Sequence, residues 1–150
     1  MRLVIQRVTR ASVSSNGELL GEIHGGAVVL AGIGREDTLD IVDRMADKLV
    51  GLRYFEDEAG RTNRAIAEAG GALLVVSQFT LYADLRHGRR PGFTPAAPPD
   101  TATPLMDRFV ERVRGHGVSV ATGRFGAEMD VALVNDGPFT LVVDSAHDLA

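Results

Sequence analysis

The chain has 150 residues and carries 16 Lys+Arg against 20 Asp+Glu, a formal net charge of -4. The length predicts a single domain over residues 1–150. The absence of cysteine excludes disulfides, a thiolate nucleophile and Cys-ligated metal sites, and the negative charge argues against a generic electrostatic binder of nucleic acid. The net charge is still compatible with a protein that binds only a short end of a nucleic acid. No apolar run reaches the ~18–20 residues of a membrane span and no signal-peptide core is present, so we expect a cytoplasmic protein.

The first part of the chain predicts three strands. Apolar and β-branched residues at 3–13 predict the first strand. Residues 19–23 predict the return strand, because Asn16-Gly17 before them is typical of a tight hairpin turn. Residues 27–33 form an unbroken apolar run, which predicts a strand buried on both faces.

The middle of the chain carries helix, strand and loop signals in turn. Asp37 or Thr38 is placed to cap a helix. The apolar positions of this helix recur at helical spacing, at Ile41, Met45, Leu49 and Leu52. Residues 53–55 predict a short strand, and residues 56–63 predict a turn-rich loop. Residues 72–81 are the most strand-like segment, whereas residues 84–99 hold four of the six prolines and predict a loop.

The last third predicts one helix and three strands. The helix is expected to begin between Pro99 and Pro104, with Leu105, Phe109 and Val113 on its apolar face. The strands are expected at 118–120, 129–135 and 139–143, with Asp136-Gly137 as a turn between the last two. About eight strands and two helices with short connections predict a mixed α/β fold. We expect two largely antiparallel β layers, with the two main helices packed on one side.

Common catalytic and cofactor patterns are missing. The four histidines lie in unrelated contexts, without metal-ligand spacing, so no metal site is expected. Neither a nucleophile elbow nor a P-loop occurs, and Gly32-Ile33-Gly34 lacks the third glycine of a dinucleotide motif. The adjacent carboxylates Glu56, Asp57 and Glu58 fit a solvated loop. No cofactor is therefore expected.

Two segments combine polar or special residues with apolar strands. Ser77, Gln78 and Thr80 end a strongly apolar run, where a buried polar group without a partner costs about 1–3 kcal/mol. Such groups fit either a ligand site or one face of an edge strand. In the second segment, Gly137-Pro138 interrupts two apolar strands. That pair fits either an ordinary hairpin turn or a special turn that is a candidate for a cis peptide bond.

Together, these two segments resemble the signature pair of bacterial-type D-aminoacyl-tRNA deacylases, the D-tyrosyl-tRNA deacylase family. The resemblance covers essentially the whole chain. The matching segments are Ser77-Gln78-Phe79-Thr80, Asn135-x-Gly137-Pro138-x-Thr140, Val4-Ile5-Gln6-Arg7-Val8, Arg90-Pro91-Gly92-Phe93 and Gly123-Arg124-Phe125-Gly126-Ala127-x-Met129. Co-occurrence of the first two is far more specific than either alone.

The resemblance implies a homodimeric hydrolase that cleaves the ester between a D-amino acid and the 3′-terminal adenosine of tRNA. It implies a chirality proofreading role in translation, with no cofactor and no membrane. In the family, a Gly-cis-Pro motif reaches into the partner's pocket and rejects L-amino acids; here it corresponds to Gly137-Pro138. The resemblance also implies two groups of site residues: catalytic Thr80, Gln78 and Phe79, and substrate-binding Ser77, Gly137, Pro138, Phe125, Met129 and Arg7.

The chemistry expected of such a site is modest. Rejection of L-amino acids by a clash leaves glycine, which has no side chain, as a possible substrate. Main-chain N–H groups near Phe79 and Thr80 can stabilise a developing oxyanion. Thr80 is a candidate nucleophile, but neither motif holds a histidine or lysine to serve as its base. We therefore favour a positioning role for Thr80.

The basic cluster Arg86-His87-Gly88-Arg89-Arg90 fits either a contact to the phosphates of the tRNA end or a solvated loop. Two other functions stay open at this point. One is an esterase of small amino esters that ignores tRNA, and the other is a non-catalytic homodimeric binder of tRNA ends or D-amino acids.

Overall fold

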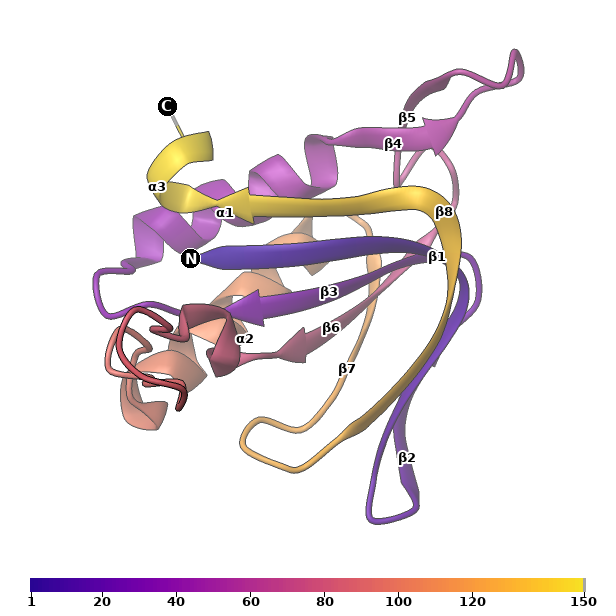
Figure 1. The fold of residues 1–150 in the computed structure, drawn as a ribbon. Helices are drawn as coiled ribbons and strands as arrows, with labels where there is room; N and C mark the ends of the chain where they lie inside the picture. The colour runs from indigo at the N-terminus through magenta and orange to yellow at the C-terminus, as the bar shows by residue number, and fades with distance from the viewer. Residues whose placement is uncertain (150) are drawn as a thin grey trace.

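A six-stranded sheet, bent along its length, is the framework of the computed structural model, which describes residues 1–149 (Figure 1). The strand order is β2-β1-β3-β6-β7, and β8 pairs with β1. These strands are β1 (Arg2–Ser15), β2 (Glu18–Ile23), β3 (Gly26–Gly32), β6 (Ala72–Ser77), β7 (Ser119–Thr122) and β8 (Asp130–Asp144). A separate two-stranded sheet holds β4 (Arg53–Glu56) and β5 (Thr62–Ala65).

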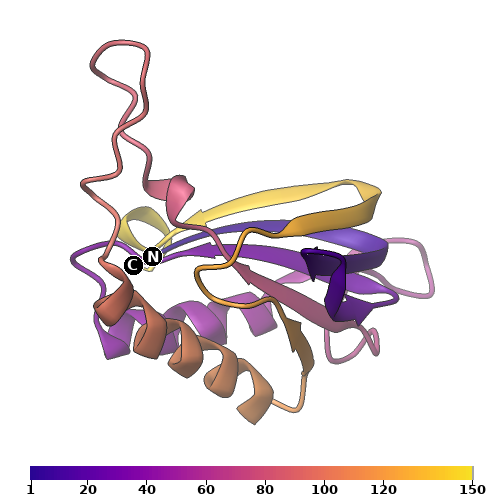
Figure 2. The same ribbon diagram turned by 90° about the horizontal axis from the view of Figure 1, so that it is seen from below.

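Two helices, α1 (Leu39–Gly51) and α2 (Pro99–Gly115), lie side by side on one face of the sheet (Figure 2). Thr38 caps α1, because its hydroxyl accepts a hydrogen bond of 3.3 Å from the amide of Ile41. Pro99 occupies the first turn of α2, where its missing N–H costs nothing. A short helix, α3 (Ser145–Asp148), follows β8. No helix among residues 1–149 is long and apolar enough to cross a membrane.

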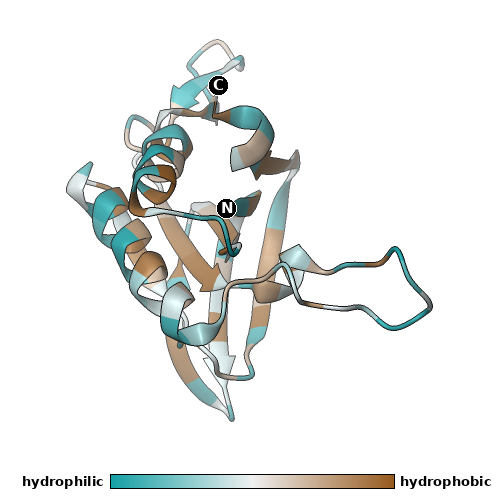
Figure 3. Ribbon diagram, turned by 90° about the vertical axis from the view of Figure 1, so that its left-hand side faces the viewer, coloured by the Kyte–Doolittle hydropathy of each residue, from teal (hydrophilic) through white to brown (hydrophobic). Residues whose placement is uncertain are grey.

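Two hydrophobic clusters cover the two faces of the sheet. The larger lies under α1 and α2, where the apolar sides of the helices meet the strands (Figure 3). The smaller fills the concave side and contains Val13, Ile23, Val28 and Leu74. Strands β3 and β6 contribute to both clusters, because successive side chains of a strand point to opposite faces. The apolar run at 27–33 is thus buried on both sides, as its sequence predicts.

The predicted fold class is confirmed: a mixed α/β protein with largely antiparallel strands and two main helices on one side. The two β layers arise from one sheet, since the long strands β1 and β8 bend and continue through both halves (Figure 1). The predicted turn at Asn16-Gly17 is confirmed, with φ of 49° and 79°. Two pairs, β3–β6 and β6–β7, are parallel.

Three predictions from the sequence were wrong in detail. The strand predicted at 72–81 ends at Ser77, and Phe79–Tyr82 form a 3-10 helix, η1. The loop predicted at 56–63 contains the start of β5, whose exposed polar residues lack an apolar alternation. The turn predicted at Asp136-Gly137 does not reverse the chain. Both halves of β8 run along β1 in one direction, and the residues between them form a bulge.

Candidate active site

A cavity of about 620 Å³ opens at the ends of β3 and β6. One wall is the end of β6 and the start of η1, and the opposite walls come from the start of α2 and the segment before β8. Five residues predicted for the site lie together in its lining: Ser77, Gln78, Phe79, Phe125 and Met129. Residues that the sequence analysis missed also line it, namely Arg35, Met106, Glu128 and the small residues Ala96 and Ala97.

The start of η1 holds two of the predicted catalytic residues in fixed positions. The amide of Gln78 donates to the carbonyl of Ala31 at 2.8 Å, which ties this segment to β3. The Gln78 side-chain amide donates to Thr80 Oγ1 at 2.5 Å. Phe79 is 56% exposed, and its ring meets that of Phe93 edge-on at a centroid distance of 5.0 Å.

Thr80 lies beside the cavity and does not line it. Its hydroxyl accepts from an amide, and an amide N–H cannot take a proton from an attacking oxygen. Hydrogen bonds of a 3-10 helix run from residue i+3 to residue i, so the amides of Phe79 and Thr80 have no partner within η1. The local structure therefore offers two main-chain donors at the position where the sequence analysis expects an oxyanion site.

Two glycines at the end of β3, Gly32 and Gly34, allow close contact with the η1 segment. A Cβ atom at Gly32 would lie 2.8 Å from the carbonyl oxygen of Gln78. A Cβ atom at Gly34 would lie 2.6 Å from the ring of Tyr82. A side chain at Gly32 would push against the backbone of Gln78, whereas one at Gly34 would displace the ring of Tyr82. Gly32 is thus a positioning residue for the wall that carries Gln78, and Gly34 leaves room for the Tyr82 ring.

The bulge in β8 contains a cis peptide bond between Gly137 and Pro138. Its register is visible in the pairing with β1: Gln6 pairs with Thr140, whereas Val8 pairs with Asn135. The residues between these two pairs on β8 therefore have no partner in β1. Both Gly137 and Pro138 are exposed, so the bulge presents its backbone to the outside of this chain.

A buried arginine holds the bulge. Arg7 is 4% exposed, and its Nε donates to the carbonyl of Asp136 at 3.2 Å and lies 3.1 Å from the carboxylate of that residue. Arg7 Nη1 donates to the carbonyl of Tyr54 at 2.7 Å, and the guanidinium lies 4.6 Å over the ring of Phe139. The Asn135 side chain donates to the Arg7 carbonyl at 2.9 Å. Arg7 therefore lies against the Gly-Pro turn and holds its backbone.

Gly137 is not required to be glycine by its own chain. It lies outside the left-handed region that favours glycine. A Cβ atom there would meet only the side-chain oxygen of Asn135, at an ordinary distance of 3.6 Å. Gly137 thus differs from Gly32 and Gly34, where a side chain would collide with atoms of the same chain.

Within one chain, the bulge and the cavity do not meet. Arg7, Gly137 and Pro138 are absent from the residues that line the cavity of Ser77 and Phe79. Asp136 instead borders a second cavity of about 680 Å³, near Val8 and Gly25. Among residues 1–149 there is also no group of three or more His, Cys, Asp or Glu side chains placed to hold a metal ion.

Comparisons with known proteins agree on one family. Residues 4–144 match the family model described as D-Tyr-tRNA(Tyr) deacylase. A protein of Symbiobacterium thermophilum named D-aminoacyl-tRNA deacylase is 58% identical, over 97% of this chain and 96% of the relative. A protein of the same name from Desulfitobacterium hafniense is 55% identical over 97% of both chains.

Two solved structures resemble this fold. The structure titled c-Myc DNA Unwinding Element Binding Protein superposes with a TM-score of 0.90 and 38% identity, covering 96% of this chain and 98% of that chain. A structure described as a probable eukaryotic D-amino acid tRNA deacylase has a TM-score of 0.81 at 19% identity, covering 95% of this chain and 97% of that one, and supports the fold alone. The family model matches residues 4–144 of the chain, and a curated relative is 58% identical over 97% of it. The chain therefore belongs to the D-Tyr-tRNA(Tyr) deacylase family.

Proposed function

We propose that this protein hydrolyses the ester between a D-amino acid and the 3′-terminal adenosine of tRNA, and so removes D-amino acids before translation. The observation that carries the proposal is the exposed Gly137-Pro138 bulge, fixed by buried Arg7, in a chain 58% identical to a D-aminoacyl-tRNA deacylase. A tRNA substrate supports a cytoplasmic location.

The proposed site is shared between two subunits. The bulge of one subunit enters the cavity of the other, beside Ser77, Gln78 and Phe79. Three observations support this arrangement: the bulge is exposed, it lies outside the cavity of its own chain, and β8 pairs on one side only. Valines 131, 134 and 142 of β8 are also exposed, which fits a second copy packed along this strand.

Selection of D over L follows from geometry in this arrangement. The two forms carry the same groups and differ in where the side chain points from Cα. Backbone groups of the Gly137-Pro138 bulge cannot rotate away, because Arg7 and Asn135 hold the backbone beside them. An L side chain would collide with the bulge, whereas a D side chain would point away from it. Glycine has no side chain to collide and should also be accepted.

Hydrolysis then needs little more than positioning. An aminoacyl ester of a ribose is already activated, and its neighbouring 2′-OH can assist. We assign stabilisation of the developing oxyanion to the amides of Phe79 and Thr80, which have no partner within η1, while the Gln78–Thr80 hydrogen bond fixes the wall. We assign Thr80 a positioning role. If Thr80→Val binds substrate normally but loses all turnover, the alternative role as nucleophile gains support.

The test is deacylation of tRNA charged with a D-amino acid, an L-amino acid or glycine. We expect hydrolysis of the D and glycyl esters and survival of the L ester. Hydrolysis of small free amino esters alone would instead indicate an esterase, and binding of tRNA ends without turnover would indicate a binding protein. Either result would overturn the proposal. Gly137→Val is the matched variant, because a Cβ atom at this position meets nothing closer than 3.6 Å in its own chain, whereas the added side chain would crowd the partner's cavity.

One structural relative is named as a DNA-binding protein, which suggests DNA binding as a second candidate function. This chain fits that function poorly. The net charge of -4 opposes broad binding to duplex phosphates. A gel shift with duplex DNA at roughly 150 mM salt tests this point, and we expect no specific complex.

A further inference from the structure

A long arm leaves the body of the protein next to the cavity. Residues 84–92, here called the basic arm, start and end at a backbone pair: the amide of Asp84 donates to Gly92 at 2.6 Å, and the amide of Gly92 donates back at 2.9 Å. The segment projects away from the sheet and helices in Figures 2 and 3. Residues 85–92 are all exposed, so the arm packs against nothing in this chain.

The arm carries arginines that bind nothing in their own chain. Twelve of the fifteen arginines use their side chains in hydrogen bonds or ion pairs with described residues. Within residues 1–149, the three without a partner are Arg10, Arg89 and Arg90. Two of the three are therefore neighbours near the tip of an exposed segment that projects from the fold.

The charge of the arm is not neutralised locally. Arg86 donates to both carboxylate oxygens of Asp84, at 2.8 and 2.7 Å, and these bonds lower the pKa of Asp84 to about 2. The charges of Asp84 and Arg86 therefore cancel, and no other acidic residue lies between 84 and 99. The arm keeps a charge of +2 from Arg89 and Arg90, so the rest of a chain with net charge -4 carries -6. A positive tip on a negative body is suited to an anion that approaches at this point only.

The base of the arm is part of the cavity wall. Phe93, directly after the arm, lines the cavity and touches Phe79 edge-on. The following segment is bonded to the end of β3, since the amide of Arg35 donates to Pro95 at 3.1 Å and the amide of Ala97 donates to Ile33 at 3.0 Å. Because Arg90 and Arg89 lie two and three residues before Gly92, their Cα atoms can lie up to roughly 7 and 11 Å from the Asp84–Gly92 pair.

From these observations we infer that the basic arm binds phosphates of the RNA strand that leads into the cavity, with Arg89 and Arg90 as the contacts. The inference rests on the proposed function, because it takes the terminal adenosine of tRNA to lie in the cavity. A guanidinium pairs with phosphate oxygens through two parallel hydrogen bonds, and unpaired arginines make such contacts without first breaking others. The arm would add affinity for the RNA, and the cavity and bulge would select the amino acid.

The experiment compares Arg89→Gln/Arg90→Gln with the wild-type protein in binding fluorescently labelled, uncharged tRNA between roughly 50 and 250 mM NaCl. We expect about a tenfold loss of affinity at the lowest salt. The slope of log affinity against log salt should fall by about 0.7 for each phosphate that the variant no longer binds, or about 1.4 for the pair. Arg89→Lys/Arg90→Lys, which keeps the charge, should retain most of the slope.

A control with the same charge change is Arg53→Gln/Arg61→Gln. Arg53 lies in β4 and Arg61 in the loop between β4 and β5, and this hairpin lies at the other end of the molecule from the arm (Figure 1). It should bind like the wild type. Equal affinity and slope for the arm variant and the wild type would overturn the inference, as would a wild-type protein that does not bind tRNA at about 50 mM salt. The inference would also be overturned if the arm variant kept its affinity for tRNA and instead lost affinity for an acidic protein that the wild type binds.

Activity separates this inference from the proposed function. On D-aminoacyl-tRNA, the arm variant should show a raised KM with little change in kcat. On D-aminoacyl-adenosine, which lacks the phosphates, the variant and the wild type should be equal. A wild type inactive on both esters would refute the proposed function while the tRNA-binding measurement still tests the arm. An equal loss of activity on both esters would mean that the arm only shapes the cavity.

Discussion

The bulge at Gly137-Pro138 and the basic arm both project from the sheet, yet their arginines are used in opposite ways. Arg7 is buried and directs its donors to the carbonyls of Tyr54 and Asp136, so it fixes the shape of the bulge. Arg89 and Arg90 hold nothing within residues 1–149 and keep their charge at the surface. The same residue type thus serves as an internal brace in one region and as an available ligand contact in the other.

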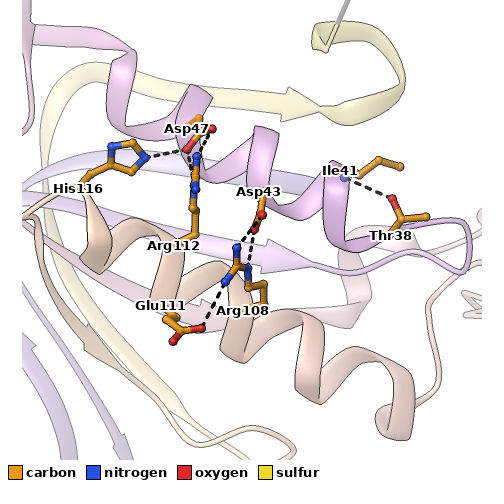
Figure 4. A network of polar contacts seen from close by, with 8 residues as sticks. All are labelled: Thr38, Ile41, Asp43, Asp47, Arg108, Glu111, Arg112 and His116. Carbon is orange, nitrogen blue, oxygen red and sulfur yellow. Dashed lines mark hydrogen bonds and ion pairs between the residues drawn. The ribbon is translucent and has the colours of Figure 1, made fainter.

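The helical layer shows a third use of arginine, between these two extremes. Arg108 binds Asp43 with two hydrogen bonds of 2.7 and 2.8 Å, and Arg112 binds Asp47 in the same way (Figure 4). His116 adds a further bond to Asp47 at 2.7 Å. These pairs join α1 to α2 at the surface, where water screens them. We therefore expect stability to depend strongly on Arg7, weakly on the helix pairs and hardly at all on the arm.

The largest effect is expected for Arg7→Ala. This change leaves the buried carbonyl of Tyr54 without its donor and removes the brace of the bulge, at a cost of about 3 kcal/mol in the free energy of unfolding. Urea unfolding at one fixed protein concentration measures the cost. Arg7→Lys, which keeps the charge but not the forked geometry, should lose less. A loss under about 1 kcal/mol for Arg7→Ala would show that the bulge is held by other groups.

A smaller effect is expected for Asp47→Asn, at most about 1 kcal/mol, because Asp47 is 41% exposed. Hydrogen bonding by Arg112 lowers the pKa of Asp47 from 3.8 to about 2. Its contribution is therefore complete above about pH 4 and is lost as the pH falls toward about 2. Melting temperatures between about pH 2 and pH 7 test this. Asp40→Asn, which affects an exposed pair at 3.6 Å, should behave like the wild type. Parallel curves for all three proteins would refute the contribution of Asp47.

The smallest effect is expected for Arg89→Gln/Arg90→Gln, which should change the free energy of unfolding by less than about 0.5 kcal/mol. Neither side chain has a partner in residues 1–149, so the substitutions break no hydrogen bond or ion pair there. The same urea series measures it. A loss comparable to that of Asp47→Asn would mean that the arm is held against the body, and the contrast with Arg7 would fail.

Much of this architecture follows from local sequence signals. The buried run of β3, the Thr38 cap and the Asn16-Gly17 turn depend on neighbours in sequence, and all three were predictable. The residues lining the cavity were partly predictable, because the resemblance names Ser77, Gln78, Phe79, Phe125 and Met129. The remaining walls come from the start of α2 and from Arg35, which only the tertiary fold brings to this point.

The β8 bulge shows where sequence reasoning reaches its limit. Asp136-Gly137 has the composition of a hairpin turn, and turn propensity alone cannot tell a reversal from a bulge. The decision depends on β1, which pairs with both halves of β8, and on Arg7, far away in sequence. Likewise, nothing local distinguishes Gly137, which its own fold does not require, from Gly32, which lies against Gln78.

Subunit complementation tests the central claim most directly, that the bulge of one subunit completes the cavity of the other. Gly137→Val is directed at the bulge, and Phe79→Pro, which removes one of the two main-chain donors proposed for the oxyanion, is directed at the cavity. Each variant alone should be inactive on D-aminoacyl-tRNA. After subunit exchange at equal amounts, half of the dimers are mixed and each holds one intact site, so about a quarter of wild-type activity should return. No recovery in a mixture that demonstrably forms mixed dimers would contradict the shared site.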